Sequence, residues 1–590
     1  MTAMTADLSE LTGLAALTDT LGRLPLLSIL TFLPALGALV LWQIAEEGEH
    51  VLIRRVTLGV LLAGLLPFAA VLAVCDFSAK TAPPLTSQTV VHHNATALQE
   101  PLTERRPWLA PEIGSSYHLG VDGTNIWLVL LTLAVAPVAV AASSGIDRRV
   151  KEFHILVLLL QSALTGAFLA QDLLLFYLFF EFTLIPTYLL VGLWGGPERR
   201  PATTQLFLYT FFGSVFTLGG MLWLAAFYAQ VTGGPMTFDI QTLFAKLPAA
   251  VAAAGPETKA YWAAAQFWVF LALAGAFLVK IPVWPLHSWL PLSYVEAPVG
   301  VTVLLSAVLS KLGAYGLLKF VVPLVPHGAL QAMPLIVGGA VIAVVYASLA
   351  ALASRDFKRL LAYSSMAHVS WCVVGTFALT VQGFGGAILQ MVTHGLASAG
   401  LFVIAGVLAE RFAARDLDSY SGLWRSMPVM AFYLLFFVLA AVGMPGLGGF
   451  VSEFLILAGM FPVSAVADLG TKVSVPGAVY AVLTATGILL GAWYLFGAAR
   501  SVLFGPERTP AGRPVIDFGL REHAMLVPLA VLLLAIGVFP RTFLRPMEKP
   551  LAALVRTVEA GGVRVQPAGG APAPTGPTVP SATADAAAAH

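Results

Sequence analysis

The chain has 590 residues, of which 58% are hydrophobic and 11% are charged, and its net charge is +1. Soluble domains carry about 25% charged residues, and a mean hydropathy of +0.85 is typical of an integral membrane protein. No basic tract suggests nucleic acid and no glycine-rich motif suggests a nucleotide. Cys75 and Cys372 cannot supply the four thiolates of an iron–sulfur cluster. We therefore expect no cofactor or metal in this chain.

Apolar runs of about 17–25 residues predict membrane-spanning helices. The sequence contains fourteen of them, near 25–45, 52–75, 123–143, 153–170, 172–192, 204–230, 260–285, 300–322, 332–353, 358–379, 385–409, 428–460, 474–499 and 524–542. Helices are favoured because the strands of a β-barrel would alternate over about ten residues. We expect an all-α polytopic membrane protein.

The loops between these runs predict the orientation in the membrane. The first residues contain Asp7 and Glu10 and no Lys or Arg, so no cleavable signal peptide is expected. Most Lys and Arg residues lie in the loops after odd-numbered spans, which the positive-inside rule places in the cytoplasm. Both termini are then expected to face outward.

Five segments follow from this pattern. They are 1–122 with two spans and a polar outer loop (76–122), 123–323 with the third span and a first repeat, 324–502 with a second repeat, 503–545 with a cytoplasmic loop and the last span, and a tail at 546–590. The tail is rich in Pro, Gly and Ala, which predicts disorder. His92 and His93 in the outer loop make a poor metal site without further ligands.

Charged side chains inside the first eight spans are unexpected unless they have a function or a partner, because inserting each one at mid-membrane costs about 2.5–3.5 kcal/mol. The sequence has three such side chains, at Glu181, Lys280 and Lys311. Lys311 lies about 16 Å from either surface, too deep for its side chain to reach water. Lys319 is close enough to its helix end to be interfacial, and Asp172 is expected to cap a helix.

The second half of the chain places His368, His394 and Glu453 inside successive spans. A lone buried histidine is more often a hydrogen-bonded packing residue than a functional one. In lipid, however, polar side chains face the bundle interior or a water-filled path, and this series is typical of a proton relay. The alternative is a set of static ion pairs that lock the helices together.

Two spans, 260–292 and 428–460, are longer than the membrane requires. Each would measure about 50 Å as a straight helix, against a hydrocarbon core of about 30 Å. Both contain helix breakers, namely Pro282 and Pro285 in the first and Pro445 with three glycines in the second. A broken helix at corresponding places in two halves indicates an inverted-repeat transporter. We expect repeats of five spans, 4–8 and 9–13, in which the fourth member is broken.

Four motifs carry a family resemblance. "HSWLP" (His287–Pro291) with "EAP" after it, "LLAYSSMAH" (Leu360–His368), "QMVTHGLASAGLF" (Gln390–Phe402) and "MPGLGGFVSEF" (Met444–Phe454) resemble the antiporter-like proton-pumping subunits of respiratory complex I. The resemblance covers about residues 25–545. Glu453 favours the M-type branch, because the L, N and Mrp D types usually have lysine there, and the chain lacks the long lateral helix of the L type.

The resemblance implies a role for each buried group. Glu181 would pair with Lys280, Lys311 would link two half-channels, His368 and His394 would form a central axis, and Glu453 would be the exit acid. Leu292 and Tyr294 depart from the Asp and His of many relatives. The implied setting is the bacterial plasma membrane beside L-type and N-type neighbours and the lateral helix of the L-type subunit, with flavin, iron–sulfur clusters and quinone in partner subunits.

Other functions stay open at this point. An Mrp-type sodium/proton antiporter subunit would use the same skeleton, and so would the membrane subunit of an energy-converting hydrogenase. A purely structural arm protein would need none of the buried charges. A small-solute carrier would need a larger polar cavity at the midplane.

Overall fold

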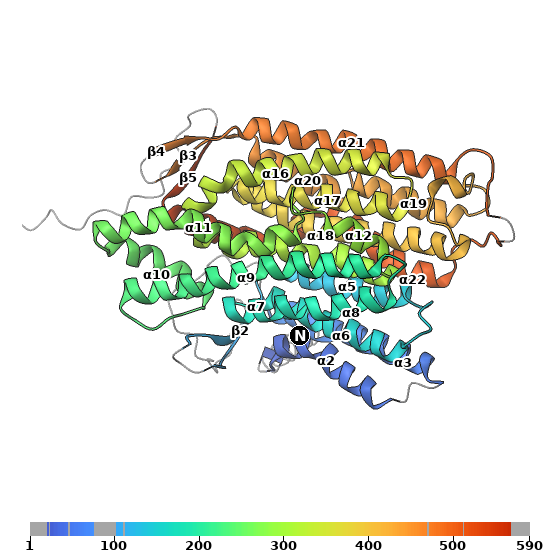
Figure 1. Cartoon of the computed structure of the whole chain (residues 1–590), viewed down its shortest axis with the longest axis horizontal. Coiled ribbons are helices and arrows are strands. Elements are labelled where there is room, and N and C mark those ends of the chain that lie inside the picture. Colours follow the sequence, from blue (N-terminus) through green and yellow to red (C-terminus); the bar gives the residue numbers. More distant parts are fainter. Residues whose placement is uncertain are drawn as a thin grey trace, which may run out of the picture.

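A computed structural model describes residues 21–22, 24–44, 48–75, 102–109, 113–468, 471–510 and 513–567. Within these residues, twelve helices are long and apolar enough to cross a membrane, and they coincide with twelve of the predicted spans. The other two predicted spans fall on the shorter apolar helix Ile126–Ala142 and on the pair Pro428–Ala441 and Gly448–Met460. The long helices lie side by side along one axis (Figure 1). The prediction of an all-α polytopic membrane protein is confirmed.

The first half of the bundle is built from the N-terminal helices and the first predicted repeat. Its elements are α2 (Leu26–Gln43), α3 (His50–Ala63), α4 (Leu65–Val74), α5 (Ile126–Ala142), α6 (Val150–Leu169), α7 (Leu173–Phe182), α8 (Leu184–Trp194), α9 (Arg199–Thr232), α10 (Ile240–Ala253), α11 (Pro256–Lys280), α12 (Trp289–Glu296), α13 (Val299–Leu304), the π-helix η1 (Leu305–Leu309), α14 (Ser310–Gly316), the π-helix η2 (Leu317–Val321) and α15 (Val322–Leu324).

The second half of the bundle contains the second predicted repeat and the C-terminal helices. Its elements are α16 (Pro326–Ala353), α17 (Phe357–Phe377), α18 (Val381–Phe412), the 3₁₀ turn η3 (Leu417–Ser419), α19 (Pro428–Ala441), α20 (Gly448–Met460), α21 (Gly477–Leu503), α22 (Leu520–Val538) and α23 (Pro540–Ala560). The span Val299–Leu324 and helix α18 are buried along their whole apolar windows, so these two form the centre of the bundle.

Both predicted helix breaks are present. Helix α11 ends at Lys280 and α12 begins at Trp289, with prolines between them that have no N–H to continue a helix. Helix α19 ends at Ala441 and α20 begins at Gly448. Between these two, Gly443 and Gly446 have φ of 79° and 92°, a conformation that favours glycine. The assignment of the spans to two inverted repeats stays a prediction.

Two small sheets lie at the end of the bundle that also holds α10 (Figure 1). Strand β1 (Thr103–Pro107) pairs antiparallel with β2 (Ser116–Gly120), so the predicted outer loop contains a hairpin. Strand β3 (Val463–Asp468) lies between β4 (Thr471–Ser474) and β5 (Val563–Pro567), both antiparallel to it. His92 and His93 lie outside the described residues.

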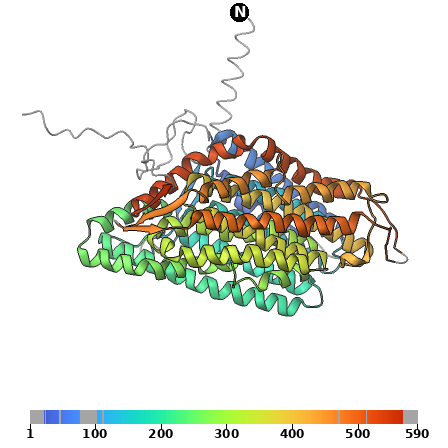
Figure 2. The same cartoon turned by 90° about the horizontal axis from the view of Figure 1, so that it is seen from above.

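The prediction of a disordered tail from residue 546 is wrong as far as residue 567. Helix α23 continues to Ala560 and strand β5 follows it, and Figure 2 shows α23 lying at an angle to the bundle. An apolar residue recurs every three or four positions and is buried, at Phe543, Met547, Leu551, Leu554 and Val558. This period stabilises an amphipathic helix, but the composition of the whole tail conceals it. Residues 568–590 lie outside the described part.

Candidate functional site

A row of titratable side chains runs from the central span into the second half of the bundle. Lys311 on α14 lies with its Nζ 2.7 Å from His394 Nδ1 on α18. The rings of His394 and His368 stack with their centroids 5.5 Å apart. His368 Nδ1 then lies 3.4 Å from Glu453 Oε1 on α20. Three helices and the central span therefore bring together four of the six predicted site residues.

Lys311 is fully buried and is held by polar atoms of its own span. Its Nζ donates to the Ser306 carbonyl and lies 3.4 Å from Ser310 Oγ. Ser306 belongs to the π-helix η1, in which the backbone no longer follows the i→i−4 ladder and a carbonyl can accept from a side chain. The contact with His394 suits proton transfer, because an ammonium donates to Nδ1 whereas a neutral amine accepts from an Nδ1–H.

His368 and His394 line a cavity of about 10 Å³, together with serines and apolar residues of α17 and α18. A space of this size is about what one water molecule needs. His368 Nε2 has no partner in the described protein, and the residue lies at the wall of this cavity. The cavity therefore leaves room for one water molecule beside the two imidazoles.

Gly443 makes room for Glu453 at the second helix break. A Cβ at position 443 would lie 2.8 Å from Glu453 Oε2, closer than side-chain atoms pack. Its φ of 79° already favours glycine. The glycine at the break thus leaves room for the Glu453 carboxylate.

The first half brings Glu181 and Lys280 close without joining them. Lys280 is 3% exposed and donates from Nζ to Thr183 Oγ1 at 2.8 Å. The ammonium also lies 4.0 Å from the centroid of the Phe180 ring, within cation–π range. Glu181 is half-buried and interacts electrostatically with Lys280. Among the described residues no ion pair within 4.0 Å joins the two, and the contacts of the Lys280 ammonium are instead with the Thr183 hydroxyl and the Phe180 ring.

Thr183 and Gly443 are among the residues of this site that the sequence analysis did not single out. Thr183 lies at the junction of α7 and α8. Pro186 follows three residues later and removes a backbone donor there, which was the available signal. Gly443 precedes "MPGLGG" and its role depends on the position of Glu453, so the sequence carries no comparable signal for it.

Two other charged residues have definite partners. Lys319 Nζ lies 2.5 Å from Asp122 Oδ2 and 3.0 Å from Thr124 Oγ1, and its side chain is 7% exposed. Lys319 is therefore buried and paired with a carboxylate that lies just before α5, and its interfacial position stays a prediction. The expectation for Asp172 is confirmed, since its carboxylate accepts from Leu174 N and Leu175 N at the start of α7.

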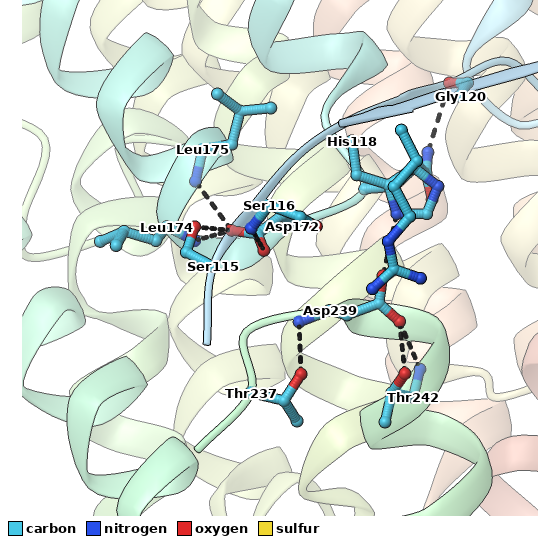
Figure 3. Close-up of polar contacts among 12 residues, drawn as sticks. Ser115, Ser116, His118, Gly120, Asp172, Leu174, Leu175, Thr237, Asp239 and Thr242 are labelled. Atoms are coloured by element: carbon cyan, nitrogen blue, oxygen red, sulfur yellow. Dashed lines mark hydrogen bonds and ion pairs between the residues drawn. The ribbon is translucent and has the colours of Figure 1, made fainter. Parts of the chain in front are cut away.

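A second polar cluster ties the β1–β2 hairpin to the bundle (Figure 3). His118 Nδ1 on β2 lies 2.9 Å from Asp239 Oδ2, which also lies 3.6 Å from Arg105. Asp239 caps α10 by accepting from Thr242 N at 2.8 Å. Burial alone would raise the pKa of Asp239, but hydrogen bonds from His118 and Thr242 and the charges of His118 and Arg105 lower it to about 2.

The same cluster includes Asp172, which accepts from Ser115 Oγ at 2.9 Å and Ser116 N at 3.0 Å. The carboxylates of Asp172 and Asp239 thus have partners that are fixed by a strand or a helix start. Such an arrangement anchors the hairpin and offers no path for a proton. Among the described residues, no group of three or more His, Cys, Asp or Glu could hold a metal ion.

Known proteins resemble this chain along most of its length. The family model described as NADH:quinone oxidoreductase/Mrp antiporter, TM, matches residues 170–475. A protein of Rhodobacter capsulatus named NADH-quinone oxidoreductase subunit M is 37% identical over 545 residues, 91% of this chain and 97% of that protein. One of the same name from Rickettsia typhi is 34% identical over 523 residues, 88% and 97% of the two chains.

A solved structure agrees with these relatives. A chain of respiratory complex I from Thermus thermophilus with bound NADH matches with a TM-score of 0.72 and 29% identity, covering 91% of this chain and all of that chain. By its sequence and its fold, the chain belongs to the NADH:quinone oxidoreductase/Mrp antiporter family, as a member of the M type.

Proposed function

We propose that this chain translocates protons as the M subunit of a bacterial NADH:quinone oxidoreductase. The observation that carries the proposal is the continuous row from Lys311 through His394 and His368 to Glu453, because each step joins two groups that can take and release a proton. A structural arm protein would not need such a row. The redox chemistry, with its flavin, iron–sulfur clusters and quinone, belongs to partner subunits.

The setting of the proposal is the bacterial plasma membrane. Both termini face outward, so α23 and the two sheets lie on the outer side and the breaks admit protons from the two aqueous phases in turn. L-type and N-type neighbours flank the chain, and the lateral helix of the L-type subunit runs beside it.

The mechanism is electrostatic. Protonated Lys280 is stabilised by Glu181 across a short gap, and a carboxylate nearby favours the charged form of a lysine whereas burial disfavours it. A movement at the α7–α8 junction that weakens this attraction releases the proton of Lys280 toward Lys311. Lys311 passes a proton to His394, and the row delivers it to Glu453 and the outside.

The experiment that tests the function reconstitutes the assembled complex in proteoliposomes and adds NADH. We expect an internal proton gradient that a protonophore abolishes and that persists when sodium is replaced by choline. An Mrp-type antiporter function would instead require sodium and would move labelled sodium ions against the proton flux. NADH oxidation with no ion movement that depends on this subunit would contradict the proposal.

A further inference from the structure

Tyr294 on α12 stands where many relatives have histidine, and the proposed relay does not include it. Its side chain is fully buried, and its ring centroid lies 6.0 Å from that of Phe402 on α18. Its hydroxyl donates to the Leu305 carbonyl at 3.0 Å. A carbonyl can only accept, so the hydroxyl hydrogen is committed to this bond. The contact therefore suits a group that holds a piece of backbone, and not one that carries a proton.

The backbone that Tyr294 contacts is the start of the π-helix η1. Leu305 is its first residue, and the N–H of Ser310, just after its end, is directed to the Leu305 carbonyl five residues earlier. In an α-helix the same N–H would bond to the carbonyl four residues earlier, which is that of Ser306. The Leu305 carbonyl therefore has two donors, one from the backbone of the wide turn and one from the Tyr294 hydroxyl.

The wide turn determines what holds Lys311. Because the Ser310 N–H is directed to Leu305, the Ser306 carbonyl is left for side chains. It accepts from Lys311 Nζ and, at 3.1 Å, from Ser310 Oγ. The same lysine nitrogen lies 2.7 Å from His394 Nδ1. A return of this turn to the α-helical pattern would give the Ser306 carbonyl back to the backbone, and Lys311 would lose the acceptor that holds it beside His394.

The helix that carries Tyr294 is itself fixed at its C-terminal end. Lys358 at the start of α17 is buried and donates to the Val295 carbonyl at 3.1 Å and to the Ala297 carbonyl. Arg415 donates to the Val295 carbonyl at 3.3 Å. The last carbonyls of a helix lack partners within the helix, and cations there also interact favourably with its dipole. The second half of the bundle therefore holds α12 immediately beyond Tyr294, which fixes the position of the hydroxyl.

We propose that Tyr294 is a positioning residue of the relay. Its hydroxyl holds the Leu305 carbonyl in the wide turn, and the turn keeps the Ser306 carbonyl free to hold Lys311 beside His394. The inference rests on the proposed proton-translocating function. Tyr294 acts through Lys311 and takes up no proton itself, so the tyrosine of this chain has a different role from a histidine that titrates in the same place.

Two substitutions at position 294 test the inference in the assembled complex. Tyr294→Phe keeps the ring and removes only the hydroxyl, and Tyr294→His supplies a titrating group that is too short to reach the Leu305 carbonyl. We expect both complexes to assemble and coupled proton uptake to fall by about tenfold or more in each, because misplacing a reacting group by about 1 Å can cost about 100-fold. Tyr315→Phe is the matched control and should pump normally, since its hydroxyl also donates to a backbone carbonyl, that of Phe168, but lies outside η1.

A double-mutant cycle separates positioning of Lys311 from a merely structural hydroxyl. The thermal midpoints of the Tyr294→Phe, Lys311→Met and doubly substituted complexes are compared with that of the wild type. We expect Tyr294→Phe to lower the midpoint of the wild-type complex and to change that of the Lys311→Met complex much less. Without the lysine the turn can return to the α-helical pattern, in which the Leu305 carbonyl leaves the hydroxyl. Substitutions of groups that do not act together give additive changes, and additive midpoints here would overturn the inference.

The pumping measurements also decide the inference by themselves. Full pumping by Tyr294→Phe would overturn it. Full pumping by Tyr294→His with loss in Tyr294→Phe would overturn it as well, because the position would then need a titrating group and not a bond to the Leu305 carbonyl. Lys311→Met distinguishes the two proposals. If it abolishes pumping while both variants at position 294 pump normally, only the positioning inference is wrong. If Lys311→Met pumps normally, the proposed function itself fails.

Discussion

Both halves of the bundle contain a broken helix beside buried charges, but the contacts of these charges differ. From the central span into the second half, Lys311, His394, His368 and Glu453 form a row, with contacts of 2.7 and 3.4 Å at its ends and stacked rings between them. In the first half, Lys280 bonds to Thr183 and faces Phe180, and Glu181 stands apart. Under the proposed function, we expect the row to pass protons and the site of Glu181 and Lys280 to hold one proton under control.

This difference follows from what surrounds each charge. An attraction between two charges in a low-dielectric interior depends steeply on their separation. A gap between Glu181 and Lys280 therefore makes their interaction adjustable, and the junction of α7 and α8 at Thr183 gives the chain a place to adjust it. A continuous row such as that of the second half has no comparable point of control.

The largest effect is expected at Lys311, because the row begins there. Lys311→Met should preserve assembly, since removing a buried charge is often neutral or stabilising, but should abolish coupled proton uptake. Lys311→Arg should fail as well, because arginine keeps its proton at any accessible pH. The measurement is the proton gradient per NADH oxidised in proteoliposomes, with Leu312→Met as the control. Full pumping by the arginine variant would remove Lys311 from the proton path.

Glu453 should come next, because it ends the row. Glu453→Gln keeps the size of the side chain but cannot titrate, and we expect pumping to fall by about 100-fold, the lower end of what one acid–base group contributes. Glu453→Asp should retain a larger part of the activity, since it titrates from a shorter side chain. Equal and normal gradients from the two variants would show that Glu453 only packs against Gly443, and the continuous row would end at His368.

The sequence was enough to predict most of this architecture. Apolar runs, breakers and the charges among them located the spans, both broken helices and the four members of the row, because lipid penalises unpaired polar groups and leaves few exceptions to interpret. The partners of these charges could not be predicted. Thr183 looks like any other threonine in a span, and the contact of Lys311 with Ser306 depends on a π-helix without a sequence signature.

Helix α23 and the Lys319–Asp122 pair were missed for a different reason. Composition averaged over residues 546–590 reflects the Pro- and Ala-rich end and obscures the apolar period before it. Asp122 and Lys319 are far apart in the sequence, so the depth of Lys319 alone favoured an interfacial side chain. In both cases the decisive information is which distant surface the segment packs against.

A moderate effect on pumping is expected from variants in the first half, because we expect these residues to control the proton on Lys280 and not to conduct protons along the row. Glu181→Ala should lower both proton uptake and coupled NADH oxidation while leaving assembly intact. Thr183→Val should act more weakly, because it removes the hydroxyl that holds Lys280 but leaves Glu181 in place. The ratio of protons to NADH, measured in both variants, sharpens the comparison. A normal ratio in the assembled Glu181→Ala complex would contradict the pairing of Glu181 with Lys280.

The smallest effect on pumping is expected from the outer cluster, which lies off the row and anchors a hairpin. Asp239→Asn should leave the proton ratio unchanged but lower the stability of the complex by about 1.5–3 kcal/mol, the value of a hydrogen bond to a charged group. Because the folded pKa of Asp239 is lowered to about 2 from a usual 3.8, its contribution is complete above the unfolded value and is lost as pH falls through the folded one. The difference in thermal midpoint between wild type and variant should therefore be constant at neutral pH and shrink as the pH falls below about 4. A changed proton ratio with unchanged stability would instead assign the cluster to the proton path, and the separation of anchoring from conduction would not hold.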